Sequence, residues 1–403
     1  MLLSSYASLL CLLLKGFQTI EATDTSNNNP YRNLSPDFAF SLFKNLETLN
    51  PNKDILISPV SISMALTMLA MGTGGPARIQ LFNGLGLDLS EMSNYDVQES
   101  FRLLYEFFRQ SDRSFKMSIG RTLFQNQTLN IMTVFPVKAQ HYYGLDNLPL
   151  DFQDWTKTSS QINEYVKNKT QGEISDLILD IQSPNTIVLI NYVFFSGTWE
   201  QAFNPEDTRL EDFYLDDMTV VKVPMMFQSN VFKYLYDSEL ECMVVQLEYK
   251  NNSTAFFILP DSKKMDMVIQ ALSPDRLRRW ATSMISSNVD LYIPKLSLSG
   301  LYDLGEILKA LSLNDLKNNH TDLNKYTSIV QTLSKVVYSS NLQFNENGQA
   351  ASSNILSRSV GRKAPAIRFN HPFIIMVFHP TSWNCLFLGK IMNPQELTGH
   401  EKP

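Results

Sequence analysis

The sequence is poor in the residues on which disulfide scaffolds and metal sites depend. Its 403 residues include only three Cys, too few for a disulfide framework. Charged residues make up only 18%, with 34 Lys and Arg against 40 Asp and Glu, so the formal net charge is −6. A mildly acidic chain is a poor candidate for binding nucleic acid through its phosphates. There are five histidines without metal-ligand spacing: His141, His320, His371, His379 and His400.

Long apolar runs and catalytic signatures are also absent from the sequence. No stretch offers the roughly 20 consecutive apolar residues that a membrane-spanning helix needs. There is no His-Glu-x-x-His, no Cys-x-x-Cys, no phosphate-binding Gly-x-x-x-x-Gly-Lys and no nucleophile elbow. We therefore expect a protein that is not an enzyme, does not contact membranes and uses no metal or cofactor.

The chain begins with the layout of a secretory signal peptide. An apolar run at 9–14 is followed by the small residue Ala22 and then by a polar stretch. We predict a signal peptide over 1–22 and a flexible segment over 23–36; the alternative is an N-terminal helix of the mature fold. Cys242 and Cys385 then remain, either paired or, in their apolar surroundings, buried as free thiols.

Six Asn-x-Ser/Thr sequons support secretion. Two of them are weaker. The sequon at Asn33 is followed by a Pro, and the sequon at Asn251 overlaps the one at Asn252. Together with the leader, the others predict a secreted glycoprotein. The expected glycosylation sites are Asn126, Asn168, Asn252 and Asn319.

Helical periodicity dominates the first half of the chain, and strand patterns dominate the second. No repeat and no linker divides the sequence, which favours one α+β domain over 37–397. The expected helices are 39–49, 61–71, 76–86, 101–108, 265–284 with a break at Pro274, and 301–311. The expected strands are 115–119, 187–195, several between 220 and 259, 289–293, 336–344, 373–378 and 384–390.

Several motifs resemble those of the serpin family. Phe369–Ile375 and the run from Leu386 to Pro394 resemble its C-terminal signature, and Asn191–Trp199 resembles its central strand. The resemblance extends from about Asp37 to Pro394, nearly the whole mature chain. It implies a serpin fold with three β-sheets, eight or nine helices and an exposed reactive loop at about 346–367. In inhibitory serpins the cleaved loop inserts as a strand into the main sheet.

The hinge of this loop matches the inhibitory pattern only in part. Glu346, Gly348 and Ala351 fit, but Gln349 stands where inhibitory serpins have the small Thr that enters the sheet first. A buried amide without partners costs about 1–3 kcal/mol. The hinge therefore speaks against fast insertion.

Two arginines are candidate protease-sensitive positions in the loop. Arg358 and Arg362 are each suitable as bait for a trypsin-like extracellular protease. The alternative is that they are ordinary arginines of an exposed loop.

Longer segments resemble the non-inhibitory, steroid-carrying members of the family: 151–155, 165–172, 289–295, 299–305 and 369–377. This resemblance implies a pocket beside the second sheet, where Trp383 stacks on the steroid and Gln246 bonds its polar end. Arg278 takes the place of a shorter polar contact. An aromatic platform with a few polar groups suits a flat apolar ligand. Taken singly, Trp383 could instead be a core aromatic and Gln246 a solvent-facing strand residue.

The leading hypothesis is therefore a secreted plasma transport protein, expected to be a monomer. Its implied ligands are cortisol, corticosterone or progesterone, with release coupled to cleavage or insertion of the reactive loop. The alternatives are a serine-protease inhibitor of the suicide-substrate type and a carrier of another hydrophobe such as thyroxine.

Overall fold

The structure is a computed structural model that describes residues 36–71, 75–87, 93–109, 115–126, 134–175, 177, 187–311, 333–346, 364–379 and 384–395. The predicted leader and most of the predicted reactive loop lie outside these residues. So do the candidate residues Gly348, Gln349, Ala351, Arg358, Arg362, Trp383 and Asn319.

The predicted α+β class is confirmed. The described residues form nine α-helices: α2 (Pro36–Leu49), α3 (Pro59–Met71), α4 (Gly75–Gly84), α5 (Asn94–Arg109), α6 (Val134–Tyr143), α7 (Trp155–Lys169), α8 (Met265–Ala271), α9 (Pro274–Ser283) and α10 (Leu304–Ala310). They form fourteen strands: β1 (Ile55–Ile57), β2 (Phe115–Asn126), β3 (Leu145–Leu150), β4 (Ile187–Gly197), β5 (Arg209–Tyr214), β6 (Val220–Asp237), β7 (Cys242–Glu248), β8 (Thr254–Pro260), β9 (Ile285–Pro294), β10 (Leu296–Asp303), β11 (Leu333–Phe344), β12 (Ala366–Arg368), β13 (Phe373–Phe378) and β14 (Cys385–Ile391).

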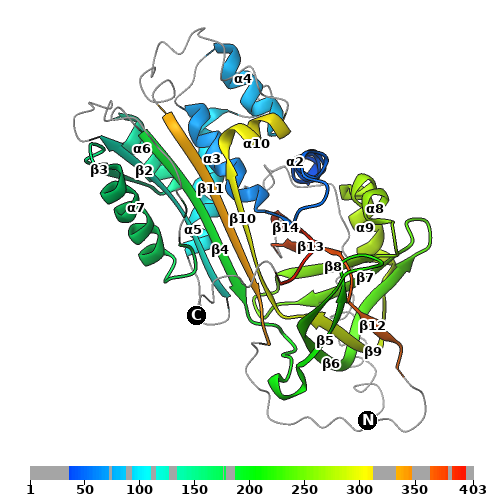
Figure 1. Ribbon diagram of the computed structural model, residues 1–403. Coiled ribbons are helices and arrows are strands. Elements are labelled where there is room, and N and C mark those ends of the chain that lie inside the picture. Colours follow the sequence, from blue (N-terminus) through cyan, green and yellow to red (C-terminus); the bar gives the residue numbers. More distant parts are fainter. Residues whose placement is uncertain are drawn as a thin grey trace, which may run out of the picture. The chain divides into compact units, whose positions relative to one another are not determined.

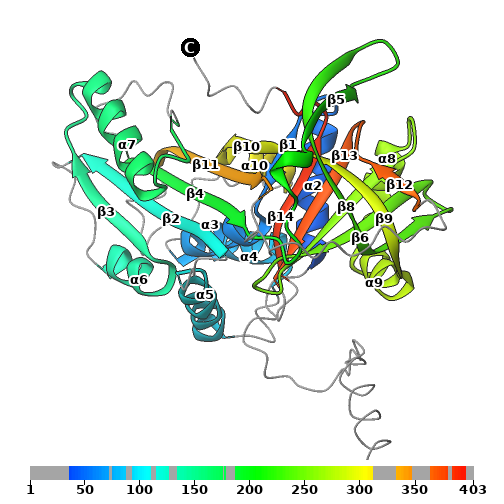
Figure 2. The ribbon, with the colours of Figure 1, turned by 90° about the horizontal axis from the view of Figure 1, so that it is seen from below.

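A five-stranded sheet is covered by helices on both faces (Figure 1). Its order is β10-β11-β4-β2-β3, and β11 pairs with β4 in parallel. Figure 2 shows α7 on one side of this sheet and α5 and α6 on the other. A strand covered on both faces is mostly apolar, which explains why β4 is apolar apart from Asn191 and its last two residues.

A nine-stranded sheet holds the rest of the strands. Its order is β1-β14-β13-β8-β7-β6-β9-β12, and β5 pairs with the start of β6. The long strand β6 pairs first with β5, then with β9 and finally with β7. Because β6 is shared in this way, two of the three expected sheets are hydrogen-bonded into one.

The break predicted at Pro274 separates α8 from α9. Ser273 caps α9, accepting a hydrogen bond at Oγ from the Arg276 backbone N–H at 3.1 Å, and Pro274 occupies the first turn. A proline fits there because the first helical N–H groups have no partner within the helix.

One sequence prediction is wrong in part. Residues 301–303 belong to strand β10 rather than to a helix, and α10 begins only at Leu304. Leu301 pairs with Ser339 and Asp303 with Val337 of β11. This pairing with a distant strand overrides the local helical spacing of the leucines.

Both remaining cysteines are free and buried. Burial raises the pKa of the Cys242 thiol to about 12 and that of Cys385 above its usual range. Such thiols are poorly reactive. Among the described residues, no helix is long and apolar enough to cross a membrane, and no group of His, Cys, Asp and Glu could hold a metal.

Candidate ligand-binding site

The candidate site lies where β6 separates from β7. The two strands pair from Asp237 and Cys242 as far as Lys233 and Gln246. From there β7 continues beside β8, and β6 continues beside β9. The separation leaves a fork in the sheet, and the segment after β4 approaches it through a hydrogen bond from the Glu200 N–H to the Glu248 carbonyl at 2.8 Å.

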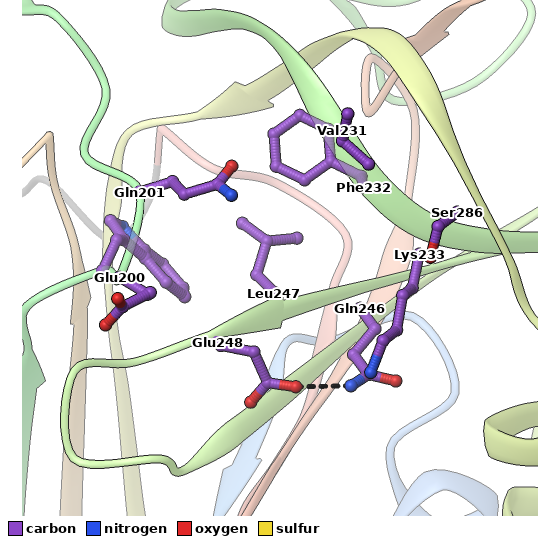
Figure 3. A pocket seen from close by; sticks show the side chains of 10 residues that line it. Glu200, Gln201, Val231, Phe232, Lys233, Gln246, Leu247, Glu248 and Ser286 are labelled. Carbon is purple, nitrogen blue, oxygen red and sulfur yellow. Dashed lines mark hydrogen bonds between the residues drawn. The ribbon is translucent and has the colours of Figure 1, made fainter. Parts of the chain in front are cut away.

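A cavity of about 250 Å³ opens at this fork (Figure 3). Of its apolar lining, Trp199, Phe232 and Leu247 are buried and Val231 is exposed, whereas its polar groups are half-buried or exposed. The lining residues are Trp199, Glu200, Gln201, Val231, Phe232, Lys233, Gln246, Leu247, Glu248 and Ser286. An apolar wall with a small number of polar groups is typical of sites for small apolar ligands.

Gln246 lines this cavity and is held by a neighbour on its own strand. Its Nε2 donates to Oε1 of Glu248 at 2.5 Å, and the Thr254 hydroxyl donates to Oε2 of Glu248 at 2.8 Å. Residues two apart on a strand point to the same face, which brings Gln246 and Glu248 together. The predicted polar contact is thus part of a three-residue hydrogen-bonded group.

The apolar wall is rigid because Trp199 is embedded among aromatic rings. Trp199 stacks on Tyr249 with 4.2 Å between ring centroids and also on Phe344. Its indole Nε1 donates to the Asn345 carbonyl at 3.1 Å. Asn345 directly precedes the predicted hinge, so a wall of the cavity is hydrogen-bonded to the base of the predicted reactive loop.

The hinge residue Glu346 is itself fixed by two partners. Its carboxylate forms an ion pair with Lys295 at 2.9 Å and accepts from the Thr208 hydroxyl at 3.0 Å. Burial alone would raise the pKa of Glu346, but the hydrogen bonds from Lys295 and Thr208 outweigh it, so this pKa lies below its usual value. The start of the predicted loop is therefore attached to the body of the protein.

Arg278 lies on the exposed side of α9 and is not among the residues that line the cavity. Its side chain is 62% exposed and pairs with Asp275 at 2.9 Å. The buried arginine of this helix is Arg276, whose guanidinium bonds Asp237 at 3.2 Å and Glu239 at 2.8 Å. The structure therefore does not bring Arg278 and Gln246 together in one cavity.

Trp383 lies outside the described residues, but the strand ends on either side of it are placed. Phe378, the last residue of β13, pairs with Thr254, which in turn pairs with Glu248. The His379 N–H donates to the Asn384 carbonyl at 3.0 Å and links the two strand ends. The residues on either side of the β13–β14 connection therefore lie at the same end of the strands as Glu248, the last residue of β7.

The described sequons differ in exposure. Asn126 is buried, with 7% of its surface exposed, whereas Asn168 on α7 and Asn252 in the β7–β8 turn are exposed. Attachment of a glycan needs an accessible side-chain amide. Asn168 and Asn252 meet that requirement, and Asn126 in this folded form does not.

Sequence reasoning missed most of the residues around Gln246. Glu248 could have been found from its spacing of two along a strand. Lys233, Glu200 and Ser286 carry no such signal, because they reach the cavity through the pairing of distant segments.

Comparisons with known proteins support one family over the whole fold. The family model described as "Serpin (serine protease inhibitor)" matches residues 33–394. The corticosteroid-binding globulins of Ovis aries and Homo sapiens are each 47% identical to the chain; the alignments cover 98% of this chain and 94% of the first relative, and 96% of this chain and 98% of the second. The solved structure of human thyroxine-binding globulin complexed with thyroxine matches with a TM-score of 0.79 and 30% identity over 91% of this chain and 98% of that one. Human kallistatin matches with a TM-score of 0.82 and 32% identity over 91% and 99%.

Proposed function

The chain belongs to the serpin family, and on that premise we propose that it is a secreted plasma carrier of glucocorticoids and progestins. The observation that carries the proposal is the 47% identity to corticosteroid-binding globulins over nearly the full length. The position of Gln246 in a cavity with an apolar wall supports it.

In this proposal the ligand binds at the ends of the strands, between the fork and the β13–β14 connection. Gln246 supplies a hydrogen bond to its polar end, and Trp383 supplies an aromatic surface for its rings. Arg278, exposed on α9, joins the site only if its side chain leaves Asp275. We therefore assign Arg278 a minor part in affinity.

We further propose that ligand release is coupled to the reactive loop. Trp199 lines the cavity and is hydrogen-bonded to Asn345, immediately before the hinge residue Glu346. Cleavage that displaces Asn345 would disturb the cavity wall. Because coupling between two sites is reciprocal, a bound steroid should in turn alter how readily the loop is cleaved.

Steroid titration tests the proposed function. We expect saturable binding of cortisol or progesterone in equilibrium dialysis, with quenching of Trp fluorescence, and loss of binding in Trp383→Ala. Trp155→Ala, on α7, is the matched control and should bind normally. Absence of binding of any steroid at micromolar concentration would contradict the proposal.

The proposal includes the maturation and location of the chain. A leader over 1–22 is removed, residues 23–36 form a flexible segment, and 37–397 form one domain that circulates as a monomeric glycoprotein. Mass spectrometry of secreted protein should find the mature N-terminus near residue 23 and glycans on Asn168 and Asn252.

The second candidate is a serpin inhibitor of an extracellular serine protease, cleaved in its loop at Arg358 or Arg362. The fit of Glu346 to the inhibitory hinge favours it. Against it stands Gln349, in place of the small Thr of the inhibitory hinge. Insertion would also require β11 and β4, which pair from Leu333 to Gln343, to separate. A denaturant-resistant complex with trypsin or a kallikrein would establish this candidate, and simple cleavage would eliminate it.

A further inference from the structure

The hydrogen-bond partner of Gln246 determines what the polar end of the cavity offers to a ligand. We propose that Glu248 makes this end select ligands that present a hydroxyl group over ligands that present a ketone. The inference rests on the proposed function, because it concerns the same cavity and the same class of ligand.

The orientation of the Gln246 amide follows from the chemistry of its neighbour. Nε2 of Gln246 lies 2.5 Å from Oε1 of Glu248. An ionised carboxylate can only accept hydrogen bonds, so the amide must turn its nitrogen toward Glu248. Its oxygen, Oε1, is then directed away from Glu248 and remains available as an acceptor (Figure 3).

The remaining hydrogen-bonding capacity of this group is mostly that of an acceptor. The Gln246 carbonyl and the unused lone pairs of Glu248 can all accept, whereas one amide N–H of Gln246 is left to donate. Thr254 has already given its hydroxyl hydrogen to Glu248. A ligand hydroxyl can donate to any of these acceptors, whereas a ketone oxygen can use only the one remaining amide N–H and lies near like partial charges and the carboxylate.

Lys233 is the competing donor on the other side of the fork. It pairs in register with Gln246, and its side chain is exposed. An exposed ammonium is hydrated and screened by salt, so it discriminates weakly between ligands. The preference for a hydroxyl should therefore persist in Lys233→Met.

A set of four steroids with one skeleton tests the inference. The set is 5α-androstane-3,17-dione, its 3-hydroxy and 17-hydroxy derivatives, and the 3,17-diol, so that either end can meet Gln246. At least one alcohol should bind about 10-fold more tightly than the dione, the scale expected for one charge-assisted hydrogen bond. In Glu248→Gln this ratio should fall to about twofold, because the new amide can donate to a ketone.

Glu164→Gln, on an exposed position of α7, is the matched control. It changes the charge in the same way outside the cavity and should keep the ratio. Thermal unfolding checks that each variant is folded, and Glu248→Asn serves the same test if Glu248→Gln does not fold.

The outcomes separate this inference from the function on which it rests. Binding of the four steroids without preference for an alcohol, or an unchanged preference in Glu248→Gln, overturns the role of Glu248 and leaves the carrier function intact. Failure of the four to bind while cortisol or progesterone binds overturns the role of Glu248 alone. Failure of all six to bind the wild-type protein overturns both.

Discussion

Each sheet of this serpin contains a group of polar side chains. In the five-stranded sheet the group is buried, and in the nine-stranded sheet it lines a cavity. In the five-stranded sheet, Arg121, Asn191 and Tyr338 lie in register on neighbouring strands, and all three are buried. We call these three residues the closed row. At the fork of the nine-stranded sheet, Gln246 and Glu248 are only half-buried and line a cavity.

The two regions differ in what completes their hydrogen bonds. Asn191 exchanges two hydrogen bonds with Ser61 of α3, and the Tyr338 hydroxyl accepts from the Ser58 N–H at 2.6 Å. Asn191 and Tyr338 of the closed row thus find their partners within the protein, whereas Arg121 keeps two donors without a partner among the described residues. At the fork, Gln246 and Glu248 retain unused acceptors beside the cavity, so a ligand can supply the missing hydrogen bonds. The closed row should therefore govern stability, and the fork should govern binding.

The largest expected effect is on the closed row. Asn191→Leu leaves the Ser61 hydroxyl and carbonyl without their buried partner, which costs about 2–4 kcal/mol of unfolding free energy. Denaturant unfolding measures it. Adding Ser61→Ala should recover part of the loss, because it removes the buried hydroxyl that has lost its partner. If the separate losses of Asn191→Leu and Ser61→Ala simply add in the double variant, the pair is not coupled.

Protonation of His379 should have the next largest effect. This ring is 3% exposed, and burial lowers the pKa of His379 to about 4. Its folded-state pKa lies below the unfolded value of about 6.5, so the unfolded state binds the proton more tightly. Stability is therefore full above pH 6.5 and falls as the pH drops toward 4, by about 1–3 kcal/mol. His379→Gln should flatten this part of the pH–stability curve, and an unchanged curve would exclude His379 as its cause.

The fold was predictable where the information is local. The apolar spacing of α2 and the proline at the start of α9 identified both helices from sequence alone. Helix α7 was missed because its buried stripe is only Thr158, Ile162 and Val166, in an otherwise polar segment. The leucine spacing predicts helix at 301–303, because the pairing of these residues with β11 is not visible locally.

The candidate site was predictable only as isolated residues. Gln246 was identified through the family resemblance and does line a cavity. The cavity itself depends on where β6 leaves β7, and that register is set by contacts between distant strands. The partner that defines the chemistry of Gln246, Glu248, was for this reason not recognised.

Within the closed row, replacing Arg121 should raise the unfolding free energy, whereas replacing Asn191 should lower it. Arg121 is 1% exposed, and Nη1 donates to the Tyr143 carbonyl at 2.9 Å, whereas Nε and Nη2 have no partner among the described residues. Burial lowers the pKa of Arg121 to about 10, so it stays charged at neutral pH. Arg121→Met should therefore stabilise the protein by about 1–2 kcal/mol in denaturant unfolding. Destabilisation would show that the bond from Arg121 to the Tyr143 carbonyl and the packing of its side chain outweigh the cost of its buried charge.

The smallest expected effect on stability is at the fork, and it completes the comparison. Gln246→Ala removes a half-buried side chain whose one hydrogen bond, to Glu248, can be replaced by water. The unfolding free energy should fall by less than about 0.5 kcal/mol, while steroid affinity should fall about 10-fold because the ligand loses its hydrogen-bond partner. Asn191→Leu should show the reverse pattern, with a large loss of stability and little change in the affinity of the folded protein. If Gln246→Ala instead lowers stability as strongly as Asn191→Leu, the fork is a structural element like the closed row, and its acceptors are not reserved for a ligand.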